Sequence, residues 1–165
     1  MQTFLPYADF TQSAKILDWR RLGKQRVEAK QLMAALNGDS KGWVNHPAAV
    51  MWRGHDKALA LYWLVMCQEW KARGYLDNLG VQAQAALDSL AAQEMTLPWW
   101  IGHEPFHASH RSNLLRKDPV HYGQFGWFES DDLEYLWPKA DRSFVVGSDS
   151  ARKRAALMPV RISHG

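Results

Sequence analysis

The stretch DKALALYWLVMCQEWKAR, residues 56–73, decides the fold. Apolar side chains occur almost all around its middle turns, which is typical of a helix that is buried on every side. Gly54 and His55 precede the stretch and Gly74 follows it, so turn residues stand at both ends. We therefore expect a central buried helix over about residues 56–73, around which the other elements pack.

The segments on both sides of this helix show helical patterns. Further helices are expected from Thr11 toward Asp18, over 20–36, from Pro47 to Trp52, over 81–94 and over 104–117. Only residues 143–146, Ser-Phe-Val-Val, resemble a strand. The sequence thus predicts an all-α fold, with a single compact helical domain over residues 1–138 and an irregular, basic and poorly packed tail over 139–165.

The composition suits a soluble domain with a sizeable core. The chain has 165 residues, 47% of them hydrophobic, and its one cysteine, Cys67, excludes an internal disulfide. No apolar run is long enough to cross a bilayer, and the N-terminal residues lack the pattern of a secretory signal. We expect a cytoplasmic monomer without membrane contact.

The charged residues are more informative than the formal net charge of +3. The expected helix 20–36 begins with a basic cluster, made up of Arg20, Arg21, Lys24 and Arg26. Four cations in one helical segment suit contact with DNA phosphates. The alternative is a solvated helix face on which Lys24 and Glu28 form an i,i+4 ion pair.

A second polar group lies in the expected helix 104–117. Helical spacing places His110, Asn113 and Lys117 on one face, and His107 and Arg111 on the neighbouring face. With Arg116, and with His46 from the loop before Pro47, these side chains predict an anion-binding surface. The alternative for the helix is a solvated C-terminal end, where the helix dipole favours cations.

Residues 103–107, His-Glu-Pro-Phe-His, match the zinc-protease pattern H-E-x-x-H. That pattern needs both histidines on one continuous helix face. Gly102 and Pro105 instead place the start of the helix inside the motif. We therefore expect no metal at this motif.

Taken in order, these segments resemble the pyrimidine-dimer DNA glycosylases of the endonuclease V type. The resemblance extends from Met1 to about Trp127 and is strongest at residues 18–22, 47–55, 67–75 and 104–116. It implies an all-α domain, double-stranded damaged or modified DNA as the partner, and neither metal nor cofactor. Arg20 and Arg116 fall on basic positions of the family's DNA-binding surface.

The resemblance also implies base excision with an associated AP lyase activity. In the family, the N-terminal α-amine attacks the sugar C1′ and forms a Schiff base, assisted by a glutamate near the start of the first long helix. Because Gln2 is large, Met1 is expected to be retained and to supply the amine. Arg21 occupies the position of the family glutamate, and Glu28 is the expected substitute. The alternative is a protein of the same fold that binds distorted or modified DNA without cutting it.

Overall fold

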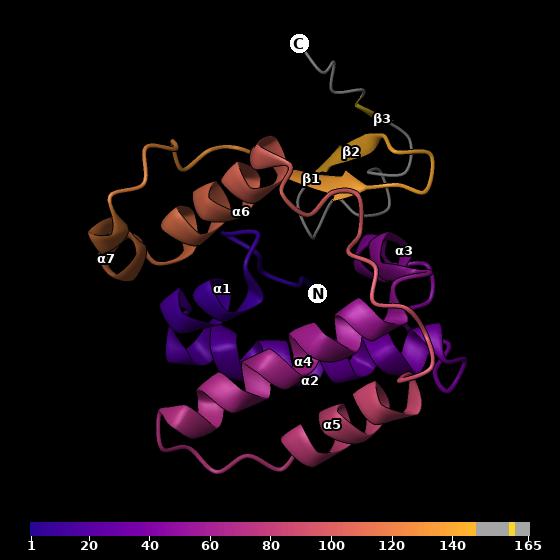
Figure 1. Ribbon diagram of the computed structural model, residues 1–165. Coiled ribbons are helices and arrows are strands. Elements are labelled where there is room, and N and C mark those ends of the chain that lie inside the picture. Colours follow the sequence, from indigo (N-terminus) through magenta and orange to yellow (C-terminus); the bar gives the residue numbers. More distant parts are fainter. Residues whose placement is uncertain (148–158, 161–165) are drawn as a thin grey trace.

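A computed structural model describes residues 1–147 and 159–160 (Figure 1). Its helices are α1 (Phe10–Ile16), α2 (Trp19–Leu36), α3 (Pro47–Trp52), α4 (Asp56–Ala72), α5 (Gly80–Ser89), α6 (Glu104–Lys117) and α7 (Pro119–Tyr122). A 3-10 turn, η1 (Gly123–Phe125), follows α7. Across the described ranges, none of the helices combines the length and the apolar character that a membrane span requires.

The long helices lie where the sequence predicts them. α2, α3, α4 and α6 match the expected ranges to within one residue. The first helix begins at Phe10 with Asp9 as its N-cap, two residues before Thr11, the predicted N-cap. α5 ends at Ser89, earlier than predicted, and α7 was not predicted.

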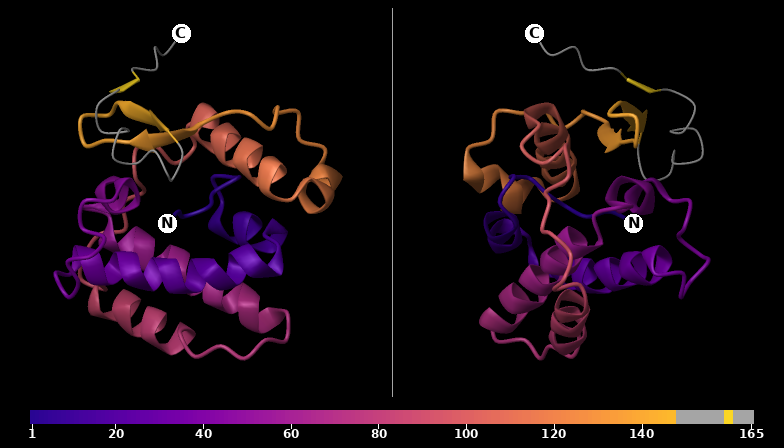
Figure 2. Two further views of the ribbon diagram at one scale, coloured as in Figure 1. Left: turned by 180° about the vertical axis from the view of Figure 1, so that it is seen from behind. Right: turned by 45° about the vertical axis from the view of Figure 1, so that its right-hand side comes forward.

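The central position predicted for residues 56–73 is confirmed. Leu59, Tyr62, Trp63 and Met66 of α4 are buried. α1, α2 and α5 all pack against this helix, and Figures 1 and 2 show α2 and α5 running along different sides of it. The apolar middle of the segment therefore meets a neighbouring helix in several directions.

The all-α prediction holds for most of the chain but is wrong after η1. β1 (Tyr135–Pro138) pairs antiparallel with β2 (Phe144–Gly147), and β2 pairs antiparallel with β3 (Pro159–Val160). Residues 143–146, which resemble a strand in the sequence, coincide with most of β2. Strands of two to four residues are otherwise too short for an alternating pattern to be recognised. β1 is buried because it packs against α6 and α3, which are distant from it or from each other in the sequence.

The predicted domain boundary at residue 138 falls between β1 and β2. Phe144 and Val145 of β2 are buried, so the first part of the predicted tail is packed into the fold. Residues 148–158 and 161–165, the rest of that tail apart from β3, lie outside the described residues.

Candidate active site

The N-terminal segment, residues 2–6, is buried although it forms no regular secondary structure. It runs between α6 on one side and α2 and α4 on the other (Figures 1 and 2). The Phe4 amide donates to Oε1 of Gln25 (2.9 Å), and the Leu5 amide donates to Nδ1 of His110 (2.9 Å). The Tyr62 hydroxyl lies 2.9 Å from the Phe4 carbonyl oxygen, to which it can donate. Buried peptide groups need such partners, and side chains of three helices supply them here.

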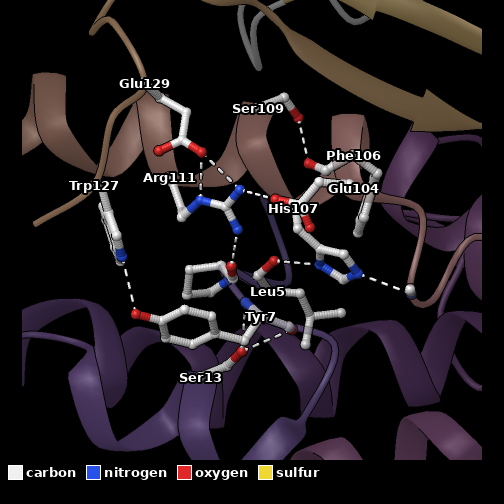
Figure 3. Close-up of polar contacts among 12 residues, drawn as sticks. Leu5, Tyr7, Ser13, Glu104, Phe106, His107, Ser109, Arg111, Trp127 and Glu129 are labelled. Carbon is white, nitrogen blue, oxygen red and sulfur yellow. Dashed lines mark hydrogen bonds and ion pairs between the residues drawn. The ribbon is translucent and has the colours of Figure 1, made fainter. Parts of the chain in front are cut away.

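His107 on α6 holds the same segment (Figure 3). The Gly102 amide donates to Nε2 of His107 (2.9 Å), so the hydrogen of the neutral ring is on Nδ1. Nδ1 in turn donates to the carbonyl oxygen of Leu5 (2.8 Å). Both ring nitrogens are therefore engaged inside the protein.

The H-E-x-x-H motif is arranged as the sequence predicts, with the helix beginning inside it. His103 is the N-cap residue outside α6, and its ring packs against Trp99 and Phe144. His107 lies within α6 and faces the N-terminal segment. In the part of the chain that the structure describes, no three His, Cys, Asp or Glu side chains are grouped to hold a metal ion.

Arg111 fixes the end of the N-terminal segment (Figure 3). Its guanidinium donates to the carbonyl oxygen of Pro6 (2.7 Å) and forms ion pairs with Glu129 (2.6 Å) and Glu104. Burial opposes the charge of Arg111, but the hydrogen bonds and charges of Glu129 and Glu104 prevail and raise its pKa. The cation is thus neutralised within the fold.

The anion-binding surface predicted for α6 is wrong for four of its residues. His107, His110, Arg111 and Asn113 are buried and hydrogen-bonded to neighbouring segments of the same chain. Arg116 is exposed, but its guanidinium donates to the carbonyl oxygen of Asp131 (2.6 Å) and to Asn113. Of the residues predicted on this helix, Lys117 alone lines the cavity described below.

Two other predicted DNA contacts are also structural. Nδ1 of His46 accepts a hydrogen bond from the Ala48 amide (2.9 Å) and so caps α3. Arg26 is buried, and its guanidinium is paired with Asp77 at 2.7 Å. Neither side chain can reach a DNA backbone without giving up these internal contacts.

The buried histidines make the stability of the protein depend on pH. Burial lowers the pKa of His107, and burial together with the charges of His107 and Arg111 lowers that of His110 well below its ordinary value. Below about pH 6.5 the unfolded chain then binds more protons than the folded one. The free energy of unfolding should be at its full value above pH 7 and fall as the pH drops from 7 to 5.5.

The slope of that fall can approach about 1.4 kcal/mol per pH unit for each histidine. Urea unfolding followed by circular dichroism at pH 7.5, 6.5 and 5.5 measures it. In a His110→Asn variant, Oδ1 can still accept from the Leu5 amide but the titrating ring is gone, so the slope should become shallower. An equal slope in the variant and the parent protein would contradict this assignment.

A cavity of about 810 Å³ opens beside the N-terminal residue. This volume falls within the range of about 300–1,000 Å³ that is usual for ligand sites. Its walls come from the N-terminal segment, the first half of α2, the end of α6 and α7. It is lined by Met1, Gln2, Phe4, Asp18, Trp19, Arg20, Arg21, Lys24, Gln25, Glu28, Lys117, Asp118 and His121.

The two predicted catalytic residues, Met1 and Glu28, both line this cavity. The Gln2 amide donates to Oε2 of Glu28 (3.1 Å), and Nε2 of Gln25 donates to the same oxygen (3.1 Å). Because the α-amine of Met1 is three bonds from the Gln2 amide nitrogen, it lies within roughly 7 Å of this carboxylate. The carboxylate and the α-amine therefore lie in the same part of the cavity, where a group that exchanges protons with an amine nucleophile would have to be.

Cations surround this pair. Arg20, Arg21 and Lys24 come from the first two turns of α2, and Lys117 comes from the end of α6. Arg20, Lys24 and Lys117 are exposed, whereas Arg21 is half-buried and paired with Asp18 at 3.1 Å. The cavity therefore joins an amine and a carboxylate to positive charge that faces solvent.

Asp18 organises the start of α2. It is the N-cap residue, accepts a hydrogen bond from the Arg21 amide (3.4 Å) and also accepts one from the Tyr122 hydroxyl. Burial disfavours the charged form, but the hydrogen bonds from Tyr122 and Arg21 and the charge of Arg21 prevail and lower the pKa of Asp18. The ionised carboxylate holds Arg21 at the cavity wall.

Seven cavity residues were not among the predicted site residues: Gln2, Phe4, Asp18, Trp19, Gln25, Asp118 and His121. Gln25 could have been found, because i,i+3 spacing places it beside Glu28. Trp19 is 55% exposed, the most exposed of the nine tryptophans, all of which lie in the described ranges. His121 lies on α7, a short helix that no pattern in the sequence predicted.

The fold and the cavity together define a class: a helical protein whose N-terminus and a carboxylate share a cavity lined by cations. The family model of the pyrimidine dimer DNA glycosylases matches residues 1–83, just over half of the chain. The protein belongs to this family. Membership of this family implies that the protein is of the DNA glycosylase type, takes part in DNA repair and acts on DNA. Comparisons with curated proteins and with solved structures gave no significant match.

The matched region contains part of the cavity. It includes α1 to α4 and the first residues of α5, and with them Met1, Arg20, Lys24 and Glu28. Lys117 and His121 lie beyond residue 83. The resemblance read from the sequence extends to about Trp127, so its part in α6 lies outside the region matched by the family model.

Proposed function

We propose that this protein is a pyrimidine-dimer DNA glycosylase with an associated AP lyase activity, and that it acts through the α-amine of Met1. The observation that carries the proposal is the Gln2–Glu28 hydrogen bond of 3.1 Å, which places a carboxylate beside the N-terminus in a cation-lined cavity. Family membership supplies the reaction class, and the cavity supplies groups suited to it.

The glycosylase step follows from the chemistry of an amine. The uncharged α-nitrogen of Met1 forms a bond to C1′ of a sugar in the dimer, and the bond from C1′ to the base breaks, leaving the electron pair on the base. The nitrogen then loses its protons as the sugar ring opens, O4′ becomes a hydroxyl and a C=N Schiff base remains. Glu28 takes up and returns protons in these steps.

The lyase step uses the same intermediate. The C=N bond acidifies the hydrogens on C2′, so that a base can remove one of them. The C3′–O3′ bond then breaks, and the strand leaves with its phosphate. Water finally hydrolyses the C=N bond and returns the free amine.

Arg20, Lys24 and Lys117 are proposed to bind the phosphates around the target sugar. Their simultaneous replacement by alanine should weaken duplex binding and lower the slope of log K against log salt by about 0.9 for each phosphate that is no longer bound. Fluorescence anisotropy with a labelled duplex at several salt concentrations measures both quantities.

A control triple variant removes Lys30, Lys41 and Lys71, which are exposed but do not line this cavity. It carries the same change in net charge and should lose less affinity and less slope. If the two triple variants behaved alike, net charge and not this surface would account for binding.

The function is tested by borohydride reduction on duplexes that carry a single cyclobutane pyrimidine dimer. The expected result is a covalent protein–DNA adduct with borohydride, and strand incision without it, both absent on undamaged duplex. An adduct on abasic DNA alone would leave a lyase without dimer glycosylase activity. Tight binding of the damaged duplex without any adduct would favour a non-catalytic DNA binder.

A further inference from the structure

We propose that Gln25 is a positioning residue that fixes the N-terminal segment and the Glu28 carboxylate relative to each other. This inference rests on the proposed function, because it concerns how the amine and the carboxylate are held for the same reaction. It adds to that function a residue that acts through Glu28 and the N-terminal segment.

The orientation of the Gln25 amide follows from its partners. The Phe4 amide can only donate, so the atom that it meets at 2.9 Å must be Oε1 of Gln25. Nε2 is then directed toward Glu28, to whose Oε2 it donates at 3.1 Å. One side-chain amide thus spans from the backbone of the N-terminal segment to the carboxylate.

Tyr62 keeps this amide in place. Its hydroxyl lies 2.5 Å from Oε1 of Gln25 and 2.9 Å from the carbonyl oxygen of Phe4, so it can donate to either. Burial, and next the negative charge of Glu28, raise the pKa of Tyr62 well above its ordinary value, so the hydroxyl keeps its proton. Gln25 itself is 1% exposed and has no room to turn toward water.

The carboxylate is held through one of its two oxygens. Nε2 of Gln25 and the Gln2 amide both donate to Oε2 of Glu28. This division reserves Oε1 for exchanging protons with the Schiff base. Without Gln25, the Glu28 side chain would regain rotamers that point away from the N-terminus, and Phe4 would lose the partner of its amide.

Gln25→Glu is the decisive variant, because it keeps the shape of the side chain. An ionised carboxylate can still accept from the Phe4 amide and from Tyr62, but it can donate to Glu28 only after taking up a proton, and until then it places a second negative charge beside Glu28. We expect single-turnover adduct formation at pH 7 to slow by about 10- to 100-fold. The acid limb of its pH profile should move upward by about one pH unit or more, because neighbouring carboxylates share a proton.

Gln25→Leu removes every polar contact of the side chain and should slow adduct formation at least as much. Hydrogen exchange at the Phe4 amide should become faster in this variant and stay slow in Gln25→Glu. Gln31→Leu, on the same helix but outside the cavity, is the matched control and should change neither quantity. Affinity for damaged duplex should stay within about threefold in Gln25→Leu and Gln31→Leu, because neither alters a charge.

The outcomes separate the two proposals. An unmodified protein that forms no adduct would defeat the proposed function. Normal adduct formation by the unmodified protein, together with an unchanged rate and pH profile in Gln25→Glu, would defeat the positioning role alone. A slower rate with an unshifted pH profile would also overturn it, since a general loss of packing lowers the rate without moving the acid limb of the profile.

Discussion

Changing Glu28 to glutamine should lower the single-turnover rate of adduct formation by about 10²- to 10⁴-fold, the usual contribution of a general acid–base group. A glutamine side chain has nearly the same shape, and its oxygen can still accept the hydrogen bond from the Gln2 amide. What it cannot do is take up and return a proton. The expected loss is therefore one of rate, with little loss of folding or of DNA affinity.

Rapid-quench kinetics with excess protein over dimer-containing duplex measures the rate, and anisotropy measures the affinity. Glu69→Gln is the matched control, because Glu69 is paired with Arg73 at 2.9 Å and does not line the cavity. A Glu28→Gln protein with the rate of the parent would remove Glu28 from the chemistry. A proportional loss of affinity and rate would instead assign it to substrate binding.

Acetylation of the N-terminal nitrogen should abolish adduct formation altogether. An amide nitrogen cannot form a Schiff base, so no reducible intermediate arises. Extending the chain by one residue should be nearly as damaging. The segment 2–6 is anchored to α2, α4 and α6 and has no slack, so an added residue displaces the amine by about 3.5 Å.

Intact-mass spectrometry first establishes which residue carries the free amine in the purified protein. Borohydride trapping with acetylated and extended proteins, beside a protein extended at its C-terminus, then completes the experiment. The C-terminal extension should trap as the parent does. Trapping that survived acetylation would transfer the nucleophilic role to a lysine, with Lys24 and Lys117 as the cavity residues to test next.

The sequence predicted the helices well because their signals are local. The apolar run in α4, the Gly74 that follows it and the Pro105 near the start of α6 each act within a few positions of themselves. The sheet was missed because its short strands depend on pairing partners, and β1 on packing against α6 and α3. The pattern of residues 143–146 indicates a strand, as β2 confirms, but it does not identify these partners.

The candidate site was predicted in part, and the reason differs between α2 and α6. On α2, the face that holds Arg21, Lys24 and Glu28 does line the cavity. On α6, the spacing of His107 and Arg111 is equally regular, yet their polar atoms meet the backbone of a buried segment. Helical spacing identifies which side chains share a face. It does not identify whether that face meets solvent or a peptide backbone in need of donors and acceptors.

Nothing in residues 2–6 themselves indicated this arrangement. The segment Gln-Thr-Phe-Leu-Pro has neither helical nor strand periodicity, so its peptide groups were not assigned partners. The many polar side chains on α6 were the matching signal in the sequence, because buried peptide groups need polar partners. Its interpretation as a DNA surface followed from treating polar residues as exposed, which is their commoner situation.

The anchoring of the N-terminus also has a consequence for how the protein is made. Leu5 is held by His110, 105 positions later in the chain. A ribosome adds about 5–20 residues per second, so α6 is synthesised roughly 5–20 s after the N-terminal segment to which it is hydrogen-bonded. The first residues to be made are thus among the last to be fixed. A nascent or truncated chain would carry the α-amine but lack the contacts from α6 that fix the N-terminal segment. On the proposed mechanism, it would react with DNA only after α6 had been synthesised.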